Sequence, residues 1–361
     1  MNQEQKLTLL LEDGTRITGK SFGYYGETEG EVVFNTSMVG YPEAFTDPSY
    51  RGQILTLTYP LIGNYGIPDE NKLADNLHEN FESSEIQIKA LLVTEYSENS
   101  SHWTAKISLK DWLKKNKIPA ITGIDTRALT QKIREKGAML GKIILNEKEK
   151  LPPKFFDPNN TNLVDEVSIK KPITYKKGQK HVVIIDYGIK NNIIRNFLER
   201  NISLTIIPWN YDPFEHNLRF DGLFLTNGPG DPMMIKESCK VVQKAMEKKM
   251  PIWGICMGNH ILALSAGAKT YKLKYGHRSQ NQPCLDLETG RCYITSQNHG
   301  YAVDAKTLPK GWKIWLINAN DHTVEGIKHA SLPFKSVQFH PEATPGPIDT
   351  EHFFDDFVKI L

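Results

Sequence analysis

One cysteine flanked by two glycines constrains the fold of this chain more than any other feature of its sequence. The stretch 251–264 reads PIWGICMGNHILAL, a short apolar run followed by apolar residues at helical spacing. Cys256 stands between the two halves, with Gly254 two positions before it and Gly258 two positions after it. This is the nucleophile-elbow pattern with cysteine in the place of serine, and it predicts a sharp turn from a buried strand into a helix. Side chains at the two flanking positions would collide in such a turn, so both positions are glycine.

The predicted elbow would put Cys256 in a position that suits a nucleophile. It holds the side chain at the edge of the sheet, above the start of the following helix. Unpaired N–H groups and the positive end of that helix favour a thiolate. The competing interpretation is a buried structural cysteine, which is common for a single cysteine in a strand–helix joint. The two glycines at elbow spacing favour the nucleophile.

Composition narrows the class of protein. A length of 361 residues fits about two domains. Lys and Arg number 44 against 42 Asp and Glu, with no basic block, so nucleic acid is not an expected partner. The four cysteines form no C-x-x-C pair, which disfavours a zinc site and a disulfide framework, and no metal is expected. Residues 1–14 lack a signal-peptide core and no apolar run reaches membrane-spanning length, so we expect a cytoplasmic protein without membrane contact.

Residues 1–150 are expected to form a β-rich α+β domain. Strands are predicted at 7–11, 15–19, 31–34 and 53–58, and helices at 109–115 and 126–136. Glu12-Asp13-Gly14 is a hairpin signal between the first two strands, and Asp125 is the expected N-cap of the second helix, which Gly137 ends. No catalytic constellation is visible here, so this part is interpreted as a binding or interaction domain.

A linker is predicted at 151–180, where apolar residues give way to Lys, Pro and Asn. Residues 181–361 then predict an α/β domain. Strands at 182–185, 203–207 and 222–226 alternate with helices at 192–199 and 237–248. This alternation favours a largely parallel central sheet flanked by helices. Further strands are predicted at 291–296, 311–317 and 335–339, and a final amphipathic helix at 351–361.

Three more stretches of this half carry polar groups suited to chemistry. The loop 227–232 reads NGPGDP after an apolar strand, and its glycines let the backbone approach a ligand. Its amides and the N–H of Met257 are candidate donors to an oxyanion, although a Gly-Pro-Gly turn alone is most often only a turn. The second stretch, 297–301, reads QNHGY and forms a polar island after a strand.

The third stretch, QFHPE at 338–342, contains a candidate base. In an extended chain His340 and Glu342 share a face, and Pro341 helps to set that geometry. A carboxylate beside an imidazole holds its tautomer and stabilises its charged form. His-x-Glu alone is a weak signal, but with a cysteine elbow in the same sheet it predicts a Cys256–His340–Glu342 triad.

These motifs resemble those of the class I glutamine amidotransferases: GICMG at 254–258, NGPGDP at 227–232, QNHG at 297–300 and HPE at 340–342. The segments GEVVFNTSM at 30–38, TDPSY at 46–50 and DTR at 125–127 resemble one branch, the small-subunit family of the carbamoyl-phosphate synthases. The resemblance covers nearly the whole chain in the same order.

The resemblance implies glutamine hydrolysis. Cys256 would attack the side-chain amide of L-glutamine, His340 would transfer protons, Glu342 would orient His340, and a glutamyl thioester would form. Glutamine-binding positions are implied at Ser49, Gly228, Gly230, Met257, His260, Asn298, Gly300 and Tyr301. Ammonia would pass to a large subunit, in a heterodimer or a higher assembly of heterodimers, with the first domain supplying contacts. The large subunit would use ATP, Mg²⁺ and bicarbonate to make carbamoyl phosphate for arginine and pyrimidine synthesis. No cofactor is implied on this chain.

One departure from the family pattern concerns the substrate site. The family usually reads Gly-His-Gln where this chain has Gly258-Asn259-His260, so His260 replaces a glutamine-contacting Gln. Two alternatives stay open. One is a different amidotransferase or cysteine hydrolase of the same fold, against which the N-terminal motifs argue. The other is a structural subunit of an ammonia-dependent synthase with weak glutaminase activity, against which Cys256 argues.

Overall fold

The computed structural model of the chain describes residues 5–74, 76–146, 148–152 and 154–361. Two compact units make up the chain, Met1–Asn160 and Thr161–Leu361. The segment 151–180, expected to be a linker, contains helix α4 (Leu163–Val167) and strand β10 (Ile173–Tyr175), both in the second unit. The side chains of β10 are half-buried or exposed and it pairs on one side only, with β12 (Ser203–Pro208), which explains its low apolar content.

The first unit is built on a closed barrel with the strand order β1-β2-β8-β7-β4-β3-β9. Its strands are β1 (Lys6–Leu11), β2 (Arg16–Ser21), β3 (Thr28–Asn35), β4 (Gln53–Leu57), β7 (Ala90–Val93), β8 (Ala120–Thr122) and β9 (Met139–Ile144). The strands β5 (Lys72–Ala74) and β6 (Leu77–His78) form a separate pair. The predicted strands and the hairpin at residues 12–14 are confirmed, whereas β7, β8 and β9, which close the barrel, were not predicted.

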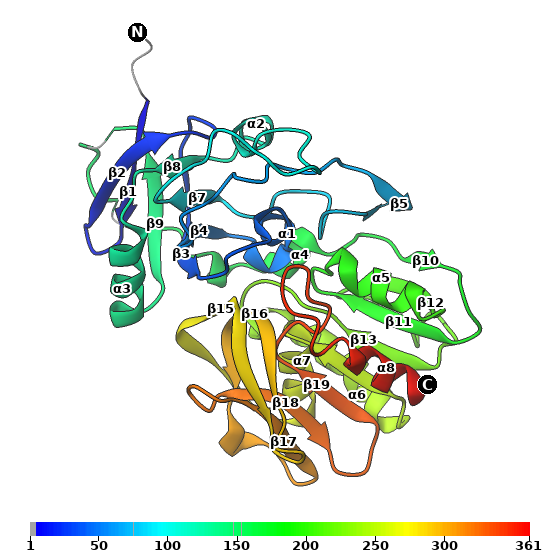
Figure 1. Ribbon diagram of the computed structural model, residues 1–361. Coiled ribbons are helices and arrows are strands. Elements are labelled where there is room, and N and C mark those ends of the chain that lie inside the picture. Colours follow the sequence, from blue (N-terminus) through cyan, green and yellow to red (C-terminus); the bar gives the residue numbers. More distant parts are fainter. Residues whose placement is uncertain (1–4, 75, 147, 153) are drawn as a thin grey trace. The chain divides into compact units, whose positions relative to one another are not determined.

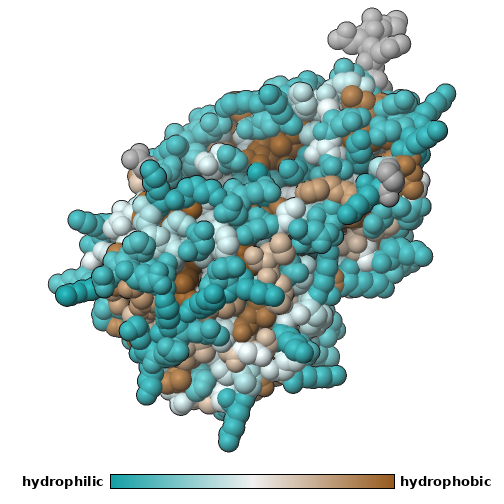
Figure 2. All heavy atoms as spheres, turned by 180° about the vertical axis from the view of Figure 1, so that it is seen from behind, coloured by the Kyte–Doolittle hydropathy of each residue, from teal (hydrophilic) through white to brown (hydrophobic). Residues whose placement is uncertain are grey.

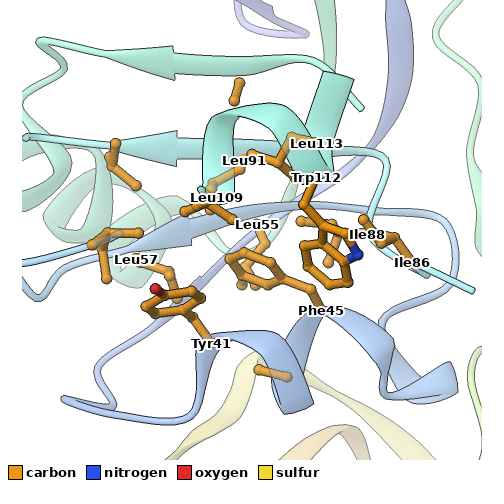
Figure 3. Packing of buried hydrophobic residues seen from close by; sticks show 14 of the residues in the cluster. Tyr41, Phe45, Leu55, Leu57, Ile86, Ile88, Leu91, Leu109, Trp112 and Leu113 are labelled. Atoms are coloured by element: carbon orange, nitrogen blue, oxygen red, sulfur yellow. The ribbon is translucent and has the colours of Figure 1, made fainter. Parts of the chain in front are cut away.

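The helices of the first unit are α1 (Tyr41–Thr46), α2 (Leu109–Lys115) and α3 (Thr126–Lys136), and the two predicted ones have the expected bounds. Asp125 caps α3 by accepting a hydrogen bond from the N–H of Ala128, and Gly137 ends it. Apolar side chains of α1, α2 and the strands β4 and β7 pack into one core (Figure 3). Phe45 stacks on Trp112 there, with ring centroids 6.5 Å apart.

The second unit contains a ten-stranded sheet with the order β10-β12-β11-β13-β14-β19-β18-β17-β15-β16 (Figure 1). The strands not yet given are β11 (His181–Asp186), β13 (Gly222–Leu225), β14 (Ile252–Ile255), β15 (Thr270–Asp286), β16 (Cys292–Val303), β17 (Trp312–Asn318), β18 (Val324–His329) and β19 (Phe334–Val337). The central strands β12, β11, β13, β14 and β19 are parallel, as predicted. The strands β18, β17, β15 and β16 continue the sheet antiparallel.

Helices cover both faces of the parallel part. They are α5 (Asn191–Glu199), α6 (Lys236–Glu247), α7 (Met257–Ala266) and α8 (His352–Lys359). On β13, Leu223 and Leu225 pack in one core with apolar residues of α6 and α7. Phe224 lies between them in sequence and contacts Phe197 of α5 and Phe357 of α8. β13 therefore has apolar side chains on both faces of the sheet, which explains why its sequence is a continuous apolar run.

Short 3-10 helices occur at η1 (Pro48–Tyr50), η2 (Pro158–Asn160), η3 (Pro232–Ile235) and η4 (Ala305–Thr307). No helix in the described part of the chain is long and apolar enough to cross a membrane. Figure 2 shows a largely hydrophilic face on which apolar residues gather in small separate groups.

Candidate active site

Cys256 occupies the turn between β14 and α7 with φ 54° and ψ −101°, a backbone conformation that non-glycine residues rarely adopt. A Cβ atom on Gly254 would lie 2.6 Å from the carbonyl carbon of Gly258. One on Gly258 would lie 2.2 Å from the carbonyl oxygen of Leu225. Neither position has room for a side chain, and the strand–elbow–helix geometry that the two glycines predict is present.

The elbow brings Cys256 to the junction of three strands. Its N–H donates to the carbonyl of Val337 at the end of β19, over 2.9 Å. The Sγ atom, which is buried, lies 3.8 Å from the backbone oxygen of Asn298 in β16. The thiol is thus held next to the QNHGY segment and to the residues that follow β19.

His340 and Glu342 form a buried hydrogen-bonded pair just beyond β19. The Nδ1 atom of His340 lies 2.6 Å from Oε1 of Glu342. The expected extended chain is not what positions them, since residues 341–342 form a turn in which the N–H of Ala343 donates to the carbonyl of His340. The turn keeps the two side chains together. Among the residues that the structure describes, the other ring nitrogen of His340, Nε2, has no hydrogen-bond partner within normal distance.

The surroundings of this pair favour its charged form. Burial alone would lower the pKa of His340, but the charge of Glu342 and contact with Cys256 raise it to about 10. For Glu342, burial acts to raise the pKa, and the charges of Lys190 and His340 outweigh burial and lower it to about 2. An imidazolium beside a thiolate is the arrangement in which cysteine nucleophiles work.

Lys190 is a site residue that the sequence analysis missed. Its Nζ atom lies 3.0 Å from Oε1 of Glu342 and donates to the carbonyl of Ala343 over 2.6 Å. The Lys190 side chain is 3% exposed and that of Glu342 is fully buried. Lys190 comes four residues after the last residue of β11, at a carboxyl edge of the parallel sheet, where ligands of such sheets bind. Its position just after a predicted strand of the parallel sheet was the feature that could have indicated Lys190 as a site residue.

The packing and backbone conformation of the loop after β13 require its glycines. A Cβ atom on Gly228 would lie 2.3 Å from the carbonyl oxygen of Tyr187, so the loop approaches the chain after β11 closely. Gly230 has φ +80°, which favours glycine. Met257 is the first residue of α7, so its N–H has no acceptor within the helix.

Asn298, Gly300 and Tyr301 lie inside β16, and not on a polar island after a strand as expected. β16 pairs with β15 in a long hairpin, in which Asn298 is opposite Arg278 and Tyr301 is opposite Lys272. The polar composition of both strands hid this pairing, because strand patterns depend on apolar alternation.

The two residues that depart from the family pattern have different surroundings. Asn259 is fully buried, donates from Nδ2 to Gln338 over 2.8 Å, and accepts from the hydroxyl of Ser336 over 2.8 Å. It therefore ties α7 to the end of β19, two residues before His340. His260 is also buried, and its Nδ1 has no hydrogen-bond partner in the described part of the chain. Burial lowers the pKa of His260 to about 3. The imidazole of His260 is neutral at physiological pH.

Ser49 belongs to the first unit, where it lies buried in η1. The side chain of Asp47 caps this turn by accepting from the N–H of Ser49 over 2.9 Å. A role for Ser49 in glutamine binding stays a prediction.

A parallel sheet, an elbow cysteine at its edge and a buried histidine–glutamate pair beside the thiol define a class I glutamine amidotransferase unit. In agreement, residues 183–360 match the family model described as glutamine amidotransferase class-I. Residues 9–143 match the model described as carbamoyl-phosphate synthase small chain, CPSase domain. The chain belongs to the carbamoyl-phosphate synthase small-chain family.

Similar proteins extend over nearly the whole chain. The carbamoyl phosphate synthase arginine-specific small chain of Neosartorya fischeri is 47% identical, over 98% of this chain and 79% of the relative. The multifunctional protein CAD of Squalus acanthias is 50% identical over 98% of this chain, and the mitochondrial carbamoyl-phosphate synthase [ammonia] of Homo sapiens is 49% identical over 99%. The chain spans only 16% of the CAD protein and 24% of the human protein.

Proposed function

We propose that this chain is the glutamine-hydrolysing component of a carbamoyl-phosphate synthase. The observation that carries the proposal is the geometry of three buried groups. His340 is oriented through Nδ1 by Glu342 at 2.6 Å, and its Nε2 is left without a partner beside the elbow thiol of Cys256. This is the nucleophile, base and orienting acid that acyl transfer requires.

In the first half of the proposed reaction, the Cys256 sulfur attacks the side-chain carbonyl carbon of glutamine. A C–S bond forms, and the carbonyl electron pair moves onto oxygen. The N–H of Met257, free of an intrahelical acceptor, is the candidate donor to this oxyanion, together with amides of the loop 227–232. When the carbonyl re-forms, the C–N bond breaks, and His340 gives its Nε2 proton to the leaving nitrogen. Ammonia and a glutamyl thioester result.

In the second half, water attacks the thioester carbonyl. His340 accepts a proton from this water at Nε2, the C–S bond breaks, and glutamate leaves. Glu342 holds the imidazole in the tautomer with hydrogen on Nδ1 throughout, and Lys190 keeps Glu342 ionised. The charge on Glu342 stabilises the imidazolium of His340, which exists before the first proton transfer and again after the second.

Glutamine itself would be held by residues contributed from several segments. We assign to this role Gly228, Gly230, Met257, His260, Asn298, Gly300 and Tyr301. The carbonyl of Asn298 lies against Sγ of Cys256, so β16 is in reach of a substrate bound to the thiol.

The ammonia would be consumed by a large synthase chain, with which this chain forms a heterodimer or a higher assembly. ATP, Mg²⁺ and bicarbonate would be used there to make carbamoyl phosphate for arginine and pyrimidine synthesis. The name of one relative, the carbamoyl phosphate synthase arginine-specific small chain, supports the arginine part of this proposal. The four cysteines are free thiols, which fits a reducing compartment such as the cytoplasm.

A second function is favoured by two observations. His260 replaces a residue that contacts glutamine in the family, and the human relative is named for ammonia. In that case the chain would be a structural subunit of an ammonia-dependent synthase, with weak glutaminase activity.

Glutamate release distinguishes the two functions. The chain is incubated with glutamine, with and without a large synthase chain, and glutamate is measured over time. Release that depends on Cys256 and rises with the large chain supports the first function. Ammonia-driven carbamoyl phosphate synthesis without glutamate release would establish the second.

A further inference from the structure

Three metal-ligating side chains meet inside the antiparallel part of the second unit. His277 lies on β15, His299 on β16 and Glu325 on β18, and all three are buried. One ligand atom from each falls within 4.8 Å of the other two. Oε1 of Glu325 is 3.5 Å from Nδ1 of His277 and 3.9 Å from Nε2 of His299.

The hydrogen bonds around His277 decide which ring nitrogen carries the proton. Nε2 lies 2.8 Å from a carboxylate oxygen of Asp321, which only accepts hydrogen bonds when ionised. The neutral ring therefore has its hydrogen on Nε2. Nδ1 then presents a lone pair to Glu325, and this atom is buried without a hydrogen-bond partner.

His299 is oriented in the same manner. Nδ1 lies 2.7 Å from the backbone oxygen of Tyr301, so the hydrogen of the neutral ring is on Nδ1 and Nε2 has a lone pair. Nε2 lies 3.1 Å from Oε1 of Gln297. Rotating the side-chain amide of Gln297 by 180° would point its NH₂ group at Nε2 of His299, but an existing hydrogen bond would be lost. Its NH₂ group donates to the hydroxyl of Thr295, which in turn donates to the carbonyl of Gln282.

When both imidazoles are neutral, four acceptors face one another in a buried space: Nδ1 of His277, Nε2 of His299, Oε1 of Gln297 and Oε1 of Glu325. The side-chain amide of Asn318 donates one long hydrogen bond of 3.5 Å to Oε1 of Glu325. The second carboxylate oxygen of Glu325 is buried without a partner. Buried acceptors without donors are costly, and a cation among them would satisfy them together.

We propose that His277, His299 and Glu325 form a binding site for a divalent transition-metal ion, with Zn²⁺ as the ion that the ligands fit well. Nitrogen and oxygen ligands at about 2.0–2.2 Å from tetrahedral Zn²⁺ lie about 3.4 Å apart. The 3.5 and 3.9 Å separations come close to this value. In each histidine, the ring nitrogen that does not face the site is hydrogen-bonded to a carboxylate or a backbone carbonyl, as is usual for histidines that bind metals.

The site would act on the segment that we assign to glutamine binding. His299 follows Asn298, whose carbonyl lies against the Cys256 sulfur. A metal ion would tie this part of β16 to β15 and β18, so its role is to fix the backbone beside the thiol.

The test measures Zn²⁺ binding by equilibrium dialysis with metal analysis, on the full chain carrying Cys256→Ser and Cys292→Ser. These changes remove the elbow thiol and the exposed thiol, which would compete for Zn²⁺. We expect one Zn²⁺ per chain and a higher Tm with the ion bound. Co²⁺ in its place should give the visible absorption of a tetrahedral nitrogen–oxygen site.

Variants locate the site. Glu325→Gln and His277→Asn should each weaken Zn²⁺ binding by more than a hundredfold. Asp321→Asn, which keeps the ligands but loses their support, should weaken it by about 10–100-fold. His322→Asn is the matched control, because this exposed histidine has φ +61°, which asparagine tolerates, and it should bind Zn²⁺ unchanged.

The proposal is overturned if the parent chain binds no Zn²⁺, in which case added protons on the imidazoles satisfy the acceptors. It is equally overturned if Glu325→Gln and His277→Asn retain the bound ion. Circular dichroism of the metal-free variants shows whether they fold. Should one variant fail to fold, the other and Asp321→Asn still decide the result. Because glutamate release is not the readout, this outcome is independent of the proposed glutaminase activity.

Discussion

Replacing Lys190 with methionine tests how the candidate triad is held in its charged state. Methionine keeps most of the volume of the lysine stem but removes the ammonium group that lies 3.0 Å from Glu342. The carboxylate of Glu342 would then be buried beside His340 without the opposing charge of Lys190. The carbonyl of Ala343 would also lose its 2.6 Å donor.

The size of the effect follows from the pKa of Glu342. A pKa of about 2 in the folded protein, against 4.5 ordinarily, means that folding favours the carboxylate by about 3 kcal/mol. This stability is present above pH 4.5 and is lost as the pH falls from 4.5 towards 2. Lys190 is the largest of the favourable causes. We expect Lys190→Met to lower the free energy of unfolding by about 3 kcal/mol at neutral pH, in line with other broken buried ion pairs.

Two matched variants separate charge from packing. Lys170 pairs with Asp165 at 3.3 Å, but both side chains are more than half exposed, so Lys170→Met should cost less than about 1 kcal/mol. Lys190→Met combined with Glu342→Gln removes both buried charges and should regain most of the lost stability. Glutaminase activity should fall in Lys190→Met, with its acid limb shifted to higher pH because the pKa of Glu342 rises.

Urea unfolding at pH 7 and a pH–rate profile of glutamate release are the measurements. If Lys190→Met lost no more stability than Lys170→Met, the buried ion pair would not exist as described. An unchanged acid limb would contradict the link between Lys190 and the ionisation of Glu342.

Three further predictions concern substrate, elbow and assembly. His260→Gln should lower the KM for glutamine with turnover nearly unchanged. His260→Ala should raise this KM at least about tenfold, because a hydrogen bond to a charged group of the substrate is lost. Steady-state assays measure both variants, and a wild-type KM in the alanine variant would remove His260 from the site. Gly258→Ala should prevent folding of the second unit, since the new Cβ would lie 2.2 Å from the carbonyl oxygen of Leu225, and a wild-type near-ultraviolet dichroism spectrum would contradict this. Residues 161–361 alone should bind a large synthase chain poorly in a pull-down, and capture at full-length affinity would show that the first unit is dispensable for assembly.

The parts of the fold that the sequence predicted well are those with strong local signals. Asp125 and Gly137 delimit α3 because cap residues act on their own turn. The apolar runs of β11 and β13 are buried on both faces, and their composition reports this directly. The elbow was predictable because steric exclusion at Gly254 and Gly258 depends on few atoms.

The parts that escaped prediction depend on partners distant in sequence. Strand β15 and the second part of β16, beyond the predicted strand at 291–296, contain too many polar residues to look like strands, and the pairing of β15 with β16 fixes them. Lys190 lies 152 positions before Glu342, and nothing in its neighbourhood reveals that it is buried against a carboxylate. The cluster of His277, His299 and Glu325 likewise forms only when three strands meet. Counting cysteine spacings, which argued against a metal, does not detect such a site.

Trapping the glutamyl thioester on Cys256 is the most direct test of the proposed reaction. The chain, with a large synthase chain present, is mixed with labelled glutamine, quenched in acid and examined by peptide mass spectrometry. We predict a glutamyl adduct on Cys256 that is absent from Cys256→Ser, together with loss of glutamate release and intact ammonia-dependent synthesis in that variant. Wild-type glutamate release by Cys256→Ser, or an adduct on another residue, would contradict the account.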